Sequence, residues 1–439
     1  MIYLYALLLM IVYLINAQFG LSAVLVLGIS TILYILSYLH LKSKYNRILC
    51  CVILMIISLP FSWNPMWGGR IGSSQVTWFY LWMTITIFVI ATKQNACVGK
   101  LQRYITIVCI ILLLYSFLPL LISKSILAGM KEFIMIDYLI IITIFLILKG
   151  IGCSEAEKKL LINLYVYESY LIGLGMVIQY IGFKVFGVTL FGFKTLYSWG
   201  GEIQTGCHLL MDDASSGTIA LGVGAMLALI HRKEDKKLFF ELFIIVIGMA
   251  CSGRRTGILS LLVAMGFYFV IGIKNIKGKL ISVFSFGFVS LIALRFMSFS
   301  RAISNSSQML DDNGRFQLWS EGLSLLRKQF WLGYGYDNEY LADLMPSKMI
   351  VHNTVIRWLD MGGIFYGGLL IIFFGLIMIA LKKYKQLDYF WALIYSCIGS
   401  MFIPDFLNAR FMYILIALSI MSINDRYRDR IRGIGSHER

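Results

Sequence analysis

The chain has 439 residues, of which 59% are apolar and 14% charged, and its mean hydropathy is +0.80. This composition excludes a soluble domain of this length, so lipid must surround most of the protein. The formal net charge is +16. We attribute it to loop topology and to attraction to anionic lipid, and we expect no nucleic-acid partner, because no stacking or groove-reading module accompanies the charge.

Long apolar runs alternate with short polar links from the first residue onward. A membrane-spanning helix needs roughly 20 apolar residues, and continuous runs of that length exclude the alternating strands of an outer-membrane barrel. The pattern predicts an all-α polytopic membrane protein with about fourteen transmembrane helices. The expected spans are 1–17, 20–39, 47–61, 76–92, 104–122, 132–149, 161–183, 214–231, 238–252, 256–273, 279–298, 363–381, 387–403 and 409–423.

Basic residues gather in one set of links and in the tail after residue 425. The positive-inside rule makes these segments cytoplasmic, so both termini are predicted to face the cytoplasm. The opposite, periplasmic side carries two extended segments, and long polar excursions on one side of a membrane usually carry function. The predicted divisions are an amino-terminal bundle 1–183, an external loop 184–213, helices 214–298, a large periplasmic loop 299–362 and carboxy-terminal helices with a basic tail 363–439.

The large loop has helical patterning of its own. Asp311-Asp312-Asn313-Gly314 offers N-cap chemistry, and a second short helix after Pro346 is expected to carry His352 and Asn353 to a break at Gly362-Gly363. Between them, apolar residues recur at alternating steps of three and four, which predicts an amphipathic helix lying apolar face down on the outer membrane surface. The apolar positions of this helix are Phe316, Trp319, Leu323, Leu326 and Phe330.

A second unusual feature is the tight link Ser252-Gly253-Arg254-Arg255-Thr256-Gly257 between two apolar spans, placed outside by the predicted topology. Arginine at membrane depth costs roughly 2.5 to 3.5 kcal/mol, so an anion should compensate the pair. Two interpretations stay open: Arg254 and Arg255 reach lipid phosphate at the interface, or they bind a diphosphate through paired charge-assisted hydrogen bonds.

Taken in order, these elements resemble the superfamily of O-antigen polymerases and O-antigen ligases. The resemblance covers residues 200–380 and rests on the arginine pair, on Arg315 and Trp319 before a Gly333-x-Gly335 turn, and on a histidine-led motif. That motif consists of His352-Asn353, Asp360 and Gly362-Gly363.

The resemblance implies a metal-independent glycosyltransferase of the GT-C type without a cofactor. Its donor and acceptor would be oligosaccharides linked to undecaprenyl diphosphate, at the periplasmic face. Arg255 and Arg315 match arginines thought to hold the lipid diphosphate, and His352 matches the histidine proposed to activate the acceptor hydroxyl. Transfer from a glycosyl diphosphate needs such a base and such cations, and the ordinary pKa of histidine, about 6.5, suits the first task.

Two departures from the family pattern affect the remaining assignments. Gln204-Thr205-Gly206 stands where the family often has Arg-x-x-Gly, so Lys194 or Arg254 is left to supply a third cation, and Asp360 stands where a glutamate is usual. The candidate substrate contacts are Asn353, Asp360, Asp212, His208 and Lys194, with His208 also the alternative base. We expect no metal site, because the outside lacks the carboxylate clusters that hard cations require.

The sequence leaves three functions open. We favour a polymerase that moves the growing glycan onto the next lipid-linked repeat of a surface polysaccharide (O-antigen or capsule), and a chain-length regulator protein is a candidate partner. A ligase would instead move the glycan onto lipid A core. A lipid-linked oligosaccharide transporter is the third candidate; Glu168 is the best intramembrane acid for it, but one acid is thin support.

Overall fold

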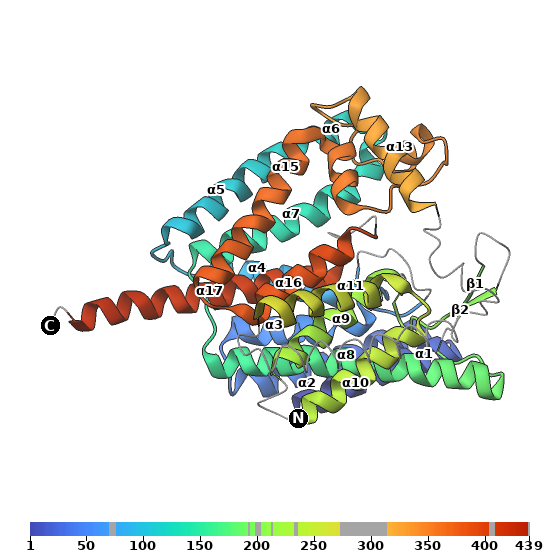
Figure 1. Cartoon of the computed structure of the whole chain (residues 1–439). Helices are drawn as coiled ribbons and strands as arrows, with labels where there is room; N and C mark the ends of the chain where they lie inside the picture. Colours follow the sequence, from blue (N-terminus) through green and yellow to red (C-terminus); the bar gives the residue numbers. More distant parts are fainter. Residues whose placement is uncertain are drawn as a thin grey trace. The chain divides into compact units, whose positions relative to one another are not determined.

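The computed structural model describes residues 1–69, 76–191, 194–197, 203–211, 214–231, 236–272, 314–403 and 409–437 (Figure 1). The chain forms two compact units. The first contains residues 1–89, 159–310 and 394–399, and the second contains 90–158, 311–393 and 400–439.

The first unit is a helical bundle. Its helices are α1 (Ile2–Phe19), α2 (Ala23–Lys42), α3 (Arg47–Ile57) with the short η1 (Leu59–Phe61), most of α4 (Trp78–Ala91) and α8 (Glu155–Phe186), α9 (Ala214–His231), α10 (Lys236–Cys251) and α11 (Arg255–Phe267), which continues as η2 (Tyr268–Gly272). A short antiparallel hairpin, β1 (Lys194–Tyr197) and β2 (Ile203–Gly206), departs from the all-α prediction.

The second unit contains α5 (Lys100–Tyr115), α6 (Phe117–Ile122), α7 (Ile126–Leu148), α13 (Arg315–Lys328), α14 (Asn338–Leu344), α15 (Thr354–Lys383) and α17 (Arg410–His437). The helix α16 (Leu387–Ser400) is divided between the units, with Ile394–Gly399 in the first and its other residues in the second. Within the second unit, α5 packs against α7 and α15, and α13 packs against α15 (Figure 1).

A helix covers every predicted span that falls within the described residues; 279–298 lies outside them. Six helices in the described part of the chain are long and apolar enough to cross a membrane: Ile2–Phe19, Ala23–Lys42, Lys100–Ile122, Glu155–Phe186, Arg255–Gly272 and Thr354–Lys383. These helices agree with a polytopic membrane protein. The count of fourteen spans stays a prediction.

The predicted break in α15 is present. Gly362 has φ −130° and ψ 16°, and Gly363 has φ 70° and ψ −170°, so the helix stops and restarts at this pair. A Cβ atom on Gly363 would lie 2.1 Å from the carbonyl oxygen of Trp331. Only glycine combines the positive φ with so close an approach of another backbone, which explains the residue type at this position.

The segment 330–335 bonds to the backbone groups that the break releases. Buried or lipid-facing backbone groups must find a partner inside the protein, because hydrocarbon offers none. The hydrogen bonds run from the Tyr334 amide to the Asp360 carbonyl (2.8 Å), from the Gly335 amide to the Met361 carbonyl (2.8 Å), from the Ile364 amide to the Phe330 carbonyl (2.9 Å), and from the Tyr115 hydroxyl to the Gly362 carbonyl (3.3 Å).

The same segment is tied to the turn between α6 and α7. The Ser123 hydroxyl oxygen accepts a hydrogen bond from the Tyr336 amide at 2.7 Å, and the Asp337 carboxylate accepts one from the Ser125 amide at 3.1 Å. A Cβ atom on Gly335, whose φ is 90°, would lie 2.6 Å from Ser123. The turn is therefore held on one side by α15 and on the other by the α6–α7 link.

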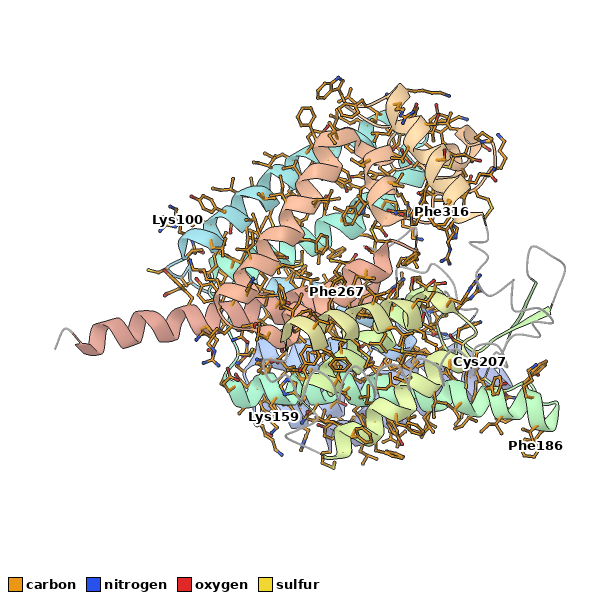
Figure 2. All side chains as sticks on the ribbon, viewed as in Figure 1. Lys100, Lys159, Phe186, Cys207, Phe267 and Phe316 are labelled. Carbon is orange, nitrogen blue, oxygen red and sulfur yellow. The ribbon has the colours of Figure 1, made fainter. Side chains whose placement is uncertain are left out.

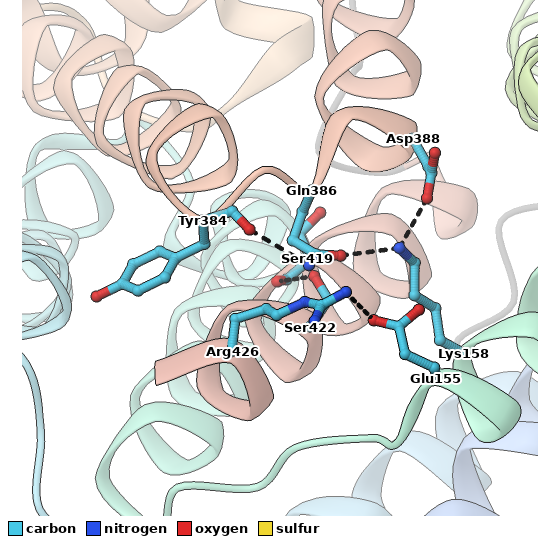
Figure 3. Close-up of polar contacts among 8 residues, drawn as sticks. All are labelled: Glu155, Lys158, Tyr384, Gln386, Asp388, Ser419, Ser422 and Arg426. Carbon is cyan, nitrogen blue, oxygen red and sulfur yellow. Dashed lines mark hydrogen bonds and ion pairs between the residues drawn. The ribbon is translucent and has the colours of Figure 1, made fainter. Parts of the chain in front are cut away.

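A polar cluster connects elements at the face predicted to be cytoplasmic (Figure 3). The Lys158 ammonium lies 2.7 Å from the Asp388 carboxylate and donates to the Gln386 side-chain oxygen at 2.8 Å. Arg426 on α17 pairs with Glu155 at 2.5 Å. These contacts join the start of α8, the α15–α16 link and α17 within the second unit.

Replacing Gly333 by alanine should destabilise the protein strongly. Gly333 has φ 68°, and an added Cβ would lie 2.6 Å from the Asp360 carbonyl oxygen. The left-handed conformation alone costs about 1 to 2 kcal/mol for alanine, and the contact with backbone adds to this cost. We expect a lower midpoint of thermal unfolding in detergent micelles.

The control is Gly375→Ala in helix α15, where no atom lies within 4 Å of the added Cβ. A helical alanine is favoured over glycine by roughly 1 kcal/mol, so this variant should match or exceed the parent in stability. Equal stability of the two variants would contradict the role given to the turn.

Candidate functional site

The predicted helix of the large loop exists as α13, which begins at Arg315 after Gly314. The proposed capping residues 311–313 lie outside the described residues. The packing of α13 differs in part from the prediction, because the protein buries Leu318, Gly322, Leu325 and Leu326. Phe316, Leu323 and Phe330 remain exposed, as a lipid-facing surface requires. Phe316, near the start of α13, is labelled in Figure 2.

Arg315 and His352 are connected through two aromatic rings. The Arg315 guanidinium lies over the ring of Phe402, 5.7 Å from its centroid, and the Trp319 ring lies 6.2 Å from the same ring. The Trp319 indole nitrogen then donates a hydrogen bond to the backbone oxygen of His352 at 3.0 Å. The second unit thus brings together the arginine and the histidine that the sequence placed 37 positions apart.

The expected short helix after Pro346 is present as the first part of α15, from Thr354 to the break at Gly362-Gly363, but it begins after His352 and Asn353. Helix α14 ends before it at Leu344, and His352 stands in the non-helical turn directly before α15. The Nδ1 atom of His352 lies 2.9 Å from the backbone oxygen of Ile350. Because a carbonyl oxygen only accepts, this hydrogen bond requires a proton on Nδ1, and in the neutral ring Nε2 then carries the lone pair. In this tautomer Nε2 is the nitrogen that can accept a proton, as a general base does.

Asn353 is buried, and its side-chain oxygen accepts hydrogen bonds from the Val355 and Ile356 amides at 3.0 and 3.2 Å. It therefore caps the amino terminus of α15 and fixes the turn that holds His352. Asp360 is also buried, close to Gly322 of α13. Neither of its carboxylate oxygens has a hydrogen-bond partner among the residues that the structure describes. Substrate contacts by these two residues stay predictions.

A small apolar core supports the segment around His352. It consists of Leu325, Met345, Val351 and Ile356, with Trp319, Tyr334 and Leu344 packed against it. At its edge, the Glu321 carboxylate accepts hydrogen bonds from the hydroxyl and amide of Ser347, at 2.6 and 3.2 Å. Burial raises the pKa of Glu321, but its hydrogen bonds from Ser347 and Gln317 outweigh burial and leave the pKa below its ordinary value.

An ion pair that was not predicted from the sequence involves Arg357, the residue after Ile356 of this core. The Arg357 guanidinium donates to the Glu132 carboxylate of α7 at 3.0 Å and to the Asn338 side-chain oxygen of α14 at 2.7 Å. The Asn338 amide nitrogen completes the triangle with a 2.9 Å bond to Glu132. Both charged side chains are at most 5% exposed. The sequence did contain a signal for this pair. Glu132 and Arg357 are opposite charges in otherwise apolar runs, which in a membrane protein indicates pairing.

Arg254 and Arg255 lie at the start of α11 in the first unit, and both are half-buried. The predicted tight link is confirmed, because α10 ends at Cys251 and Gly253 has φ 69°. The positive end of the helix dipole at a helix amino terminus favours an anion, and the two guanidinium groups add to that preference. These features suit either lipid phosphate or a diphosphate.

The remaining candidates belong to the first unit by sequence. His208 is buried at 3% exposure, in the turn between β2 and α9. Lys194 is the first residue of β1, opposite Gly206, and its side chain lies outside the described part. Asp212 lies outside the described residues altogether. Within the described chain, no group of three or more histidine, cysteine or acidic residues could hold a metal ion.

The fold and these residues define a polytopic membrane protein with cationic and imidazole groups on polar links between its helices. Residues 240–372 match a family model described as O-antigen ligase. The match confirms the resemblance to the O-antigen polymerase and ligase superfamily over this range, whose members are glycosyltransferase-like enzymes. No curated protein matches the chain. The matched range includes Arg254, Arg255, Arg315, His352 and Asp360 but not Lys194, His208 or Asp212.

Removing Arg357 should cost far more stability than removing a surface ion pair. Arg357→Ala leaves the Glu132 carboxylate buried without its cation, a change that costs about 3 to 5 kcal/mol. The control, Lys348→Ala, breaks the exposed contact between Lys348 and Asp343 at 3.9 Å and should cost under about 1 kcal/mol.

Thermal unfolding in detergent micelles measures both variants. Adding Glu132→Gln to Arg357→Ala should recover part of the loss, since the uncompensated charge is then gone. A double variant no more stable than Arg357→Ala would contradict a stabilising ion pair.

Proposed function

We propose that the protein is a polymerase of surface polysaccharide in the bacterial inner membrane. It transfers the growing glycan from undecaprenyl diphosphate to the next lipid-linked repeat unit at the periplasmic face. The family match supports glycosyl transfer, and the observation that carries the proposal is the His352 tautomer. A histidine with Nδ1–H bonded to a backbone oxygen presents Nε2 as a proton acceptor, connected through Trp319 and Phe402 to Arg315.

Each step of the reaction has a residue assigned to it. The acceptor hydroxyl oxygen attacks the anomeric carbon of the donor sugar, while His352 Nε2 takes the hydroxyl proton. The bond between the anomeric carbon and the diphosphate oxygen breaks, and undecaprenyl diphosphate leaves with the electron pair. Arg315 stabilises the charge that develops on it, and Arg254 and Arg255 are assigned to the same diphosphate from their sequence context. No cluster of histidine, cysteine or acidic residues in the described part of the chain calls for a metal in this scheme.

The ligase is the second candidate, because the matching family is described as O-antigen ligase. The two enzymes share the donor and differ in the acceptor, which is a lipid-linked repeat for the polymerase and lipid A core for the ligase. A gel of surface polysaccharide from a deletion strain separates them. Loss of a polymerase leaves core with a single repeat, whereas loss of a ligase leaves core without any.

His352 and Arg315 should give different kinetic defects in purified protein reconstituted with lipid-linked repeats. His352→Ala should keep donor binding and lose the chemical step by about 10²- to 10⁴-fold. Arg315→Ala should weaken donor binding and transfer together, and Arg315→Lys should restore only part of both, because lysine lacks the bidentate geometry. Equilibrium binding of donor and the rate of chain growth are the two measurements.

The matched control is Arg327→Ala, an exposed arginine in the last turn of the same helix α13, which should leave both quantities unchanged. A stable His352→Ala protein that binds donor and still makes long chains would refute the base assignment. Chain growth that depends on Mg²⁺ and stops in excess chelator would refute the metal-independent scheme.

A further inference from the structure

Four large apolar side chains form an exposed corner beside the break in α15: Phe330, Trp331, Leu332 and Phe365. The Trp331 ring stacks on the Phe365 ring with centroids 5.4 Å apart, and Phe330 meets Trp331 edge to face at 5.1 Å. Trp331 is nevertheless 60% exposed and Phe365 53%. Exposed aromatic residues that pack on one another form a contiguous patch, which normally marks an interaction surface.

The length of α15 determines the depth of this corner in the membrane. After Gly363 the helix is regular to Lys383, and residues 364–383 at about 1.5 Å each span about 30 Å, the thickness of the hydrocarbon core. Lys382 and Lys383 mark its cytoplasmic end, so Ile364 and Phe365 stand at the outer boundary. The hydrogen bond from the Ile364 amide to the Phe330 carbonyl holds the corner at that same level.

The apolar arc of α13 leads to the corner. At about 100° per residue, its apolar positions cover about half the helix circumference, and the protein buries only the part with Leu318, Leu325 and Leu326. Phe316 and Leu323, on the adjoining edge, stay 66% and 43% exposed. The exposed Arg327 follows Leu323 by one turn, so its side chain can reach a phosphate above an apolar edge.

We propose that the corner and the exposed edge of α13 insert into the outer surface of the phospholipid bilayer. Trp331 acts as the interfacial aromatic anchor, and Phe316, Leu323 and Leu332 enter the boundary between headgroups and acyl chains. The occupant is lipid because the corner continues the outward surface of the span α15, whose Ile372 and Ile379 are also exposed. The segment carrying Arg315 and His352 therefore rests on the bilayer. This proposal is independent of the proposed glycosyl transfer.

Spin labels on introduced cysteines test the proposal in full-length protein. The background is Cys97→Ser, because Cys97 is the exposed residue among the eight cysteines. Labels replace Leu332, Leu323 and, as the matched control, Ser324, which is the exposed polar neighbour of Leu323 on α13. The protein is reconstituted in vesicles of phosphatidylethanolamine and phosphatidylglycerol, and collisions with oxygen and with a water-soluble nickel chelate are measured by paramagnetic resonance.

Labels at 332 and 323 should collide with oxygen in preference to nickel, and the ratio of the two rates should be several-fold higher than at 324. A label at 332 that collides freely with nickel would place the corner in water and overturn the proposal. A label at 332 protected from both reagents would also overturn it, because another protein surface then covers the corner. Neither result depends on transfer activity, so failure here leaves the proposed function to its own test.

Discussion

A membrane helix that stops and restarts leaves amides and carbonyls that lipid cannot bond. In α15 the stop lies at Gly362 and Gly363, and the segment 330–335 supplies the missing partners through the Phe330 carbonyl and two amides. The two glycine motifs of the large loop therefore serve one structural purpose. Their glycines lack the Cβ that would hold the loop backbone and the α15 backbone apart, and they permit a positive φ that other residues resist.

The residues proposed for chemistry stand on this joint. Asn353 caps the amino terminus of α15 just after His352, and the Trp319 indole of α13 donates a hydrogen bond to the His352 carbonyl. Beneath them the buried pair of Arg357 and Glu132 ties the first turn of α15 to α7. Such a framework keeps the His352 ring and its tautomer fixed, which is the preorganisation that proton transfer requires. The mobile partners of the reaction would then be the lipid-linked sugars.

The sequence predicted what depends on local pattern. Apolar runs predicted the helices within the described residues, the Gly-Gly pair predicted the break in α15, and the step of three and four predicted α13. It could not predict which edge of α13 the protein buries, since apolar positions favour lipid and protein alike. The bond between Arg357 and Glu132 joins positions 225 apart, and the hydrogen bond that selects the His352 tautomer depends on a turn without a repeating pattern.

Hydrogen exchange of the reconstituted protein, followed by mass spectrometry, tests the central joint most directly. If the segment 330–335 is bonded to the broken helix, peptides containing Tyr334 and Gly335 should exchange slowly, in step with peptides containing Ile364. The link at Met349 and Ile350, within the same loop, provides the fast reference, because neither amide has a hydrogen-bond partner among the described residues. Exchange of the Tyr334 and Gly335 amides at the rate of that link, with α15 still protected, would contradict the account.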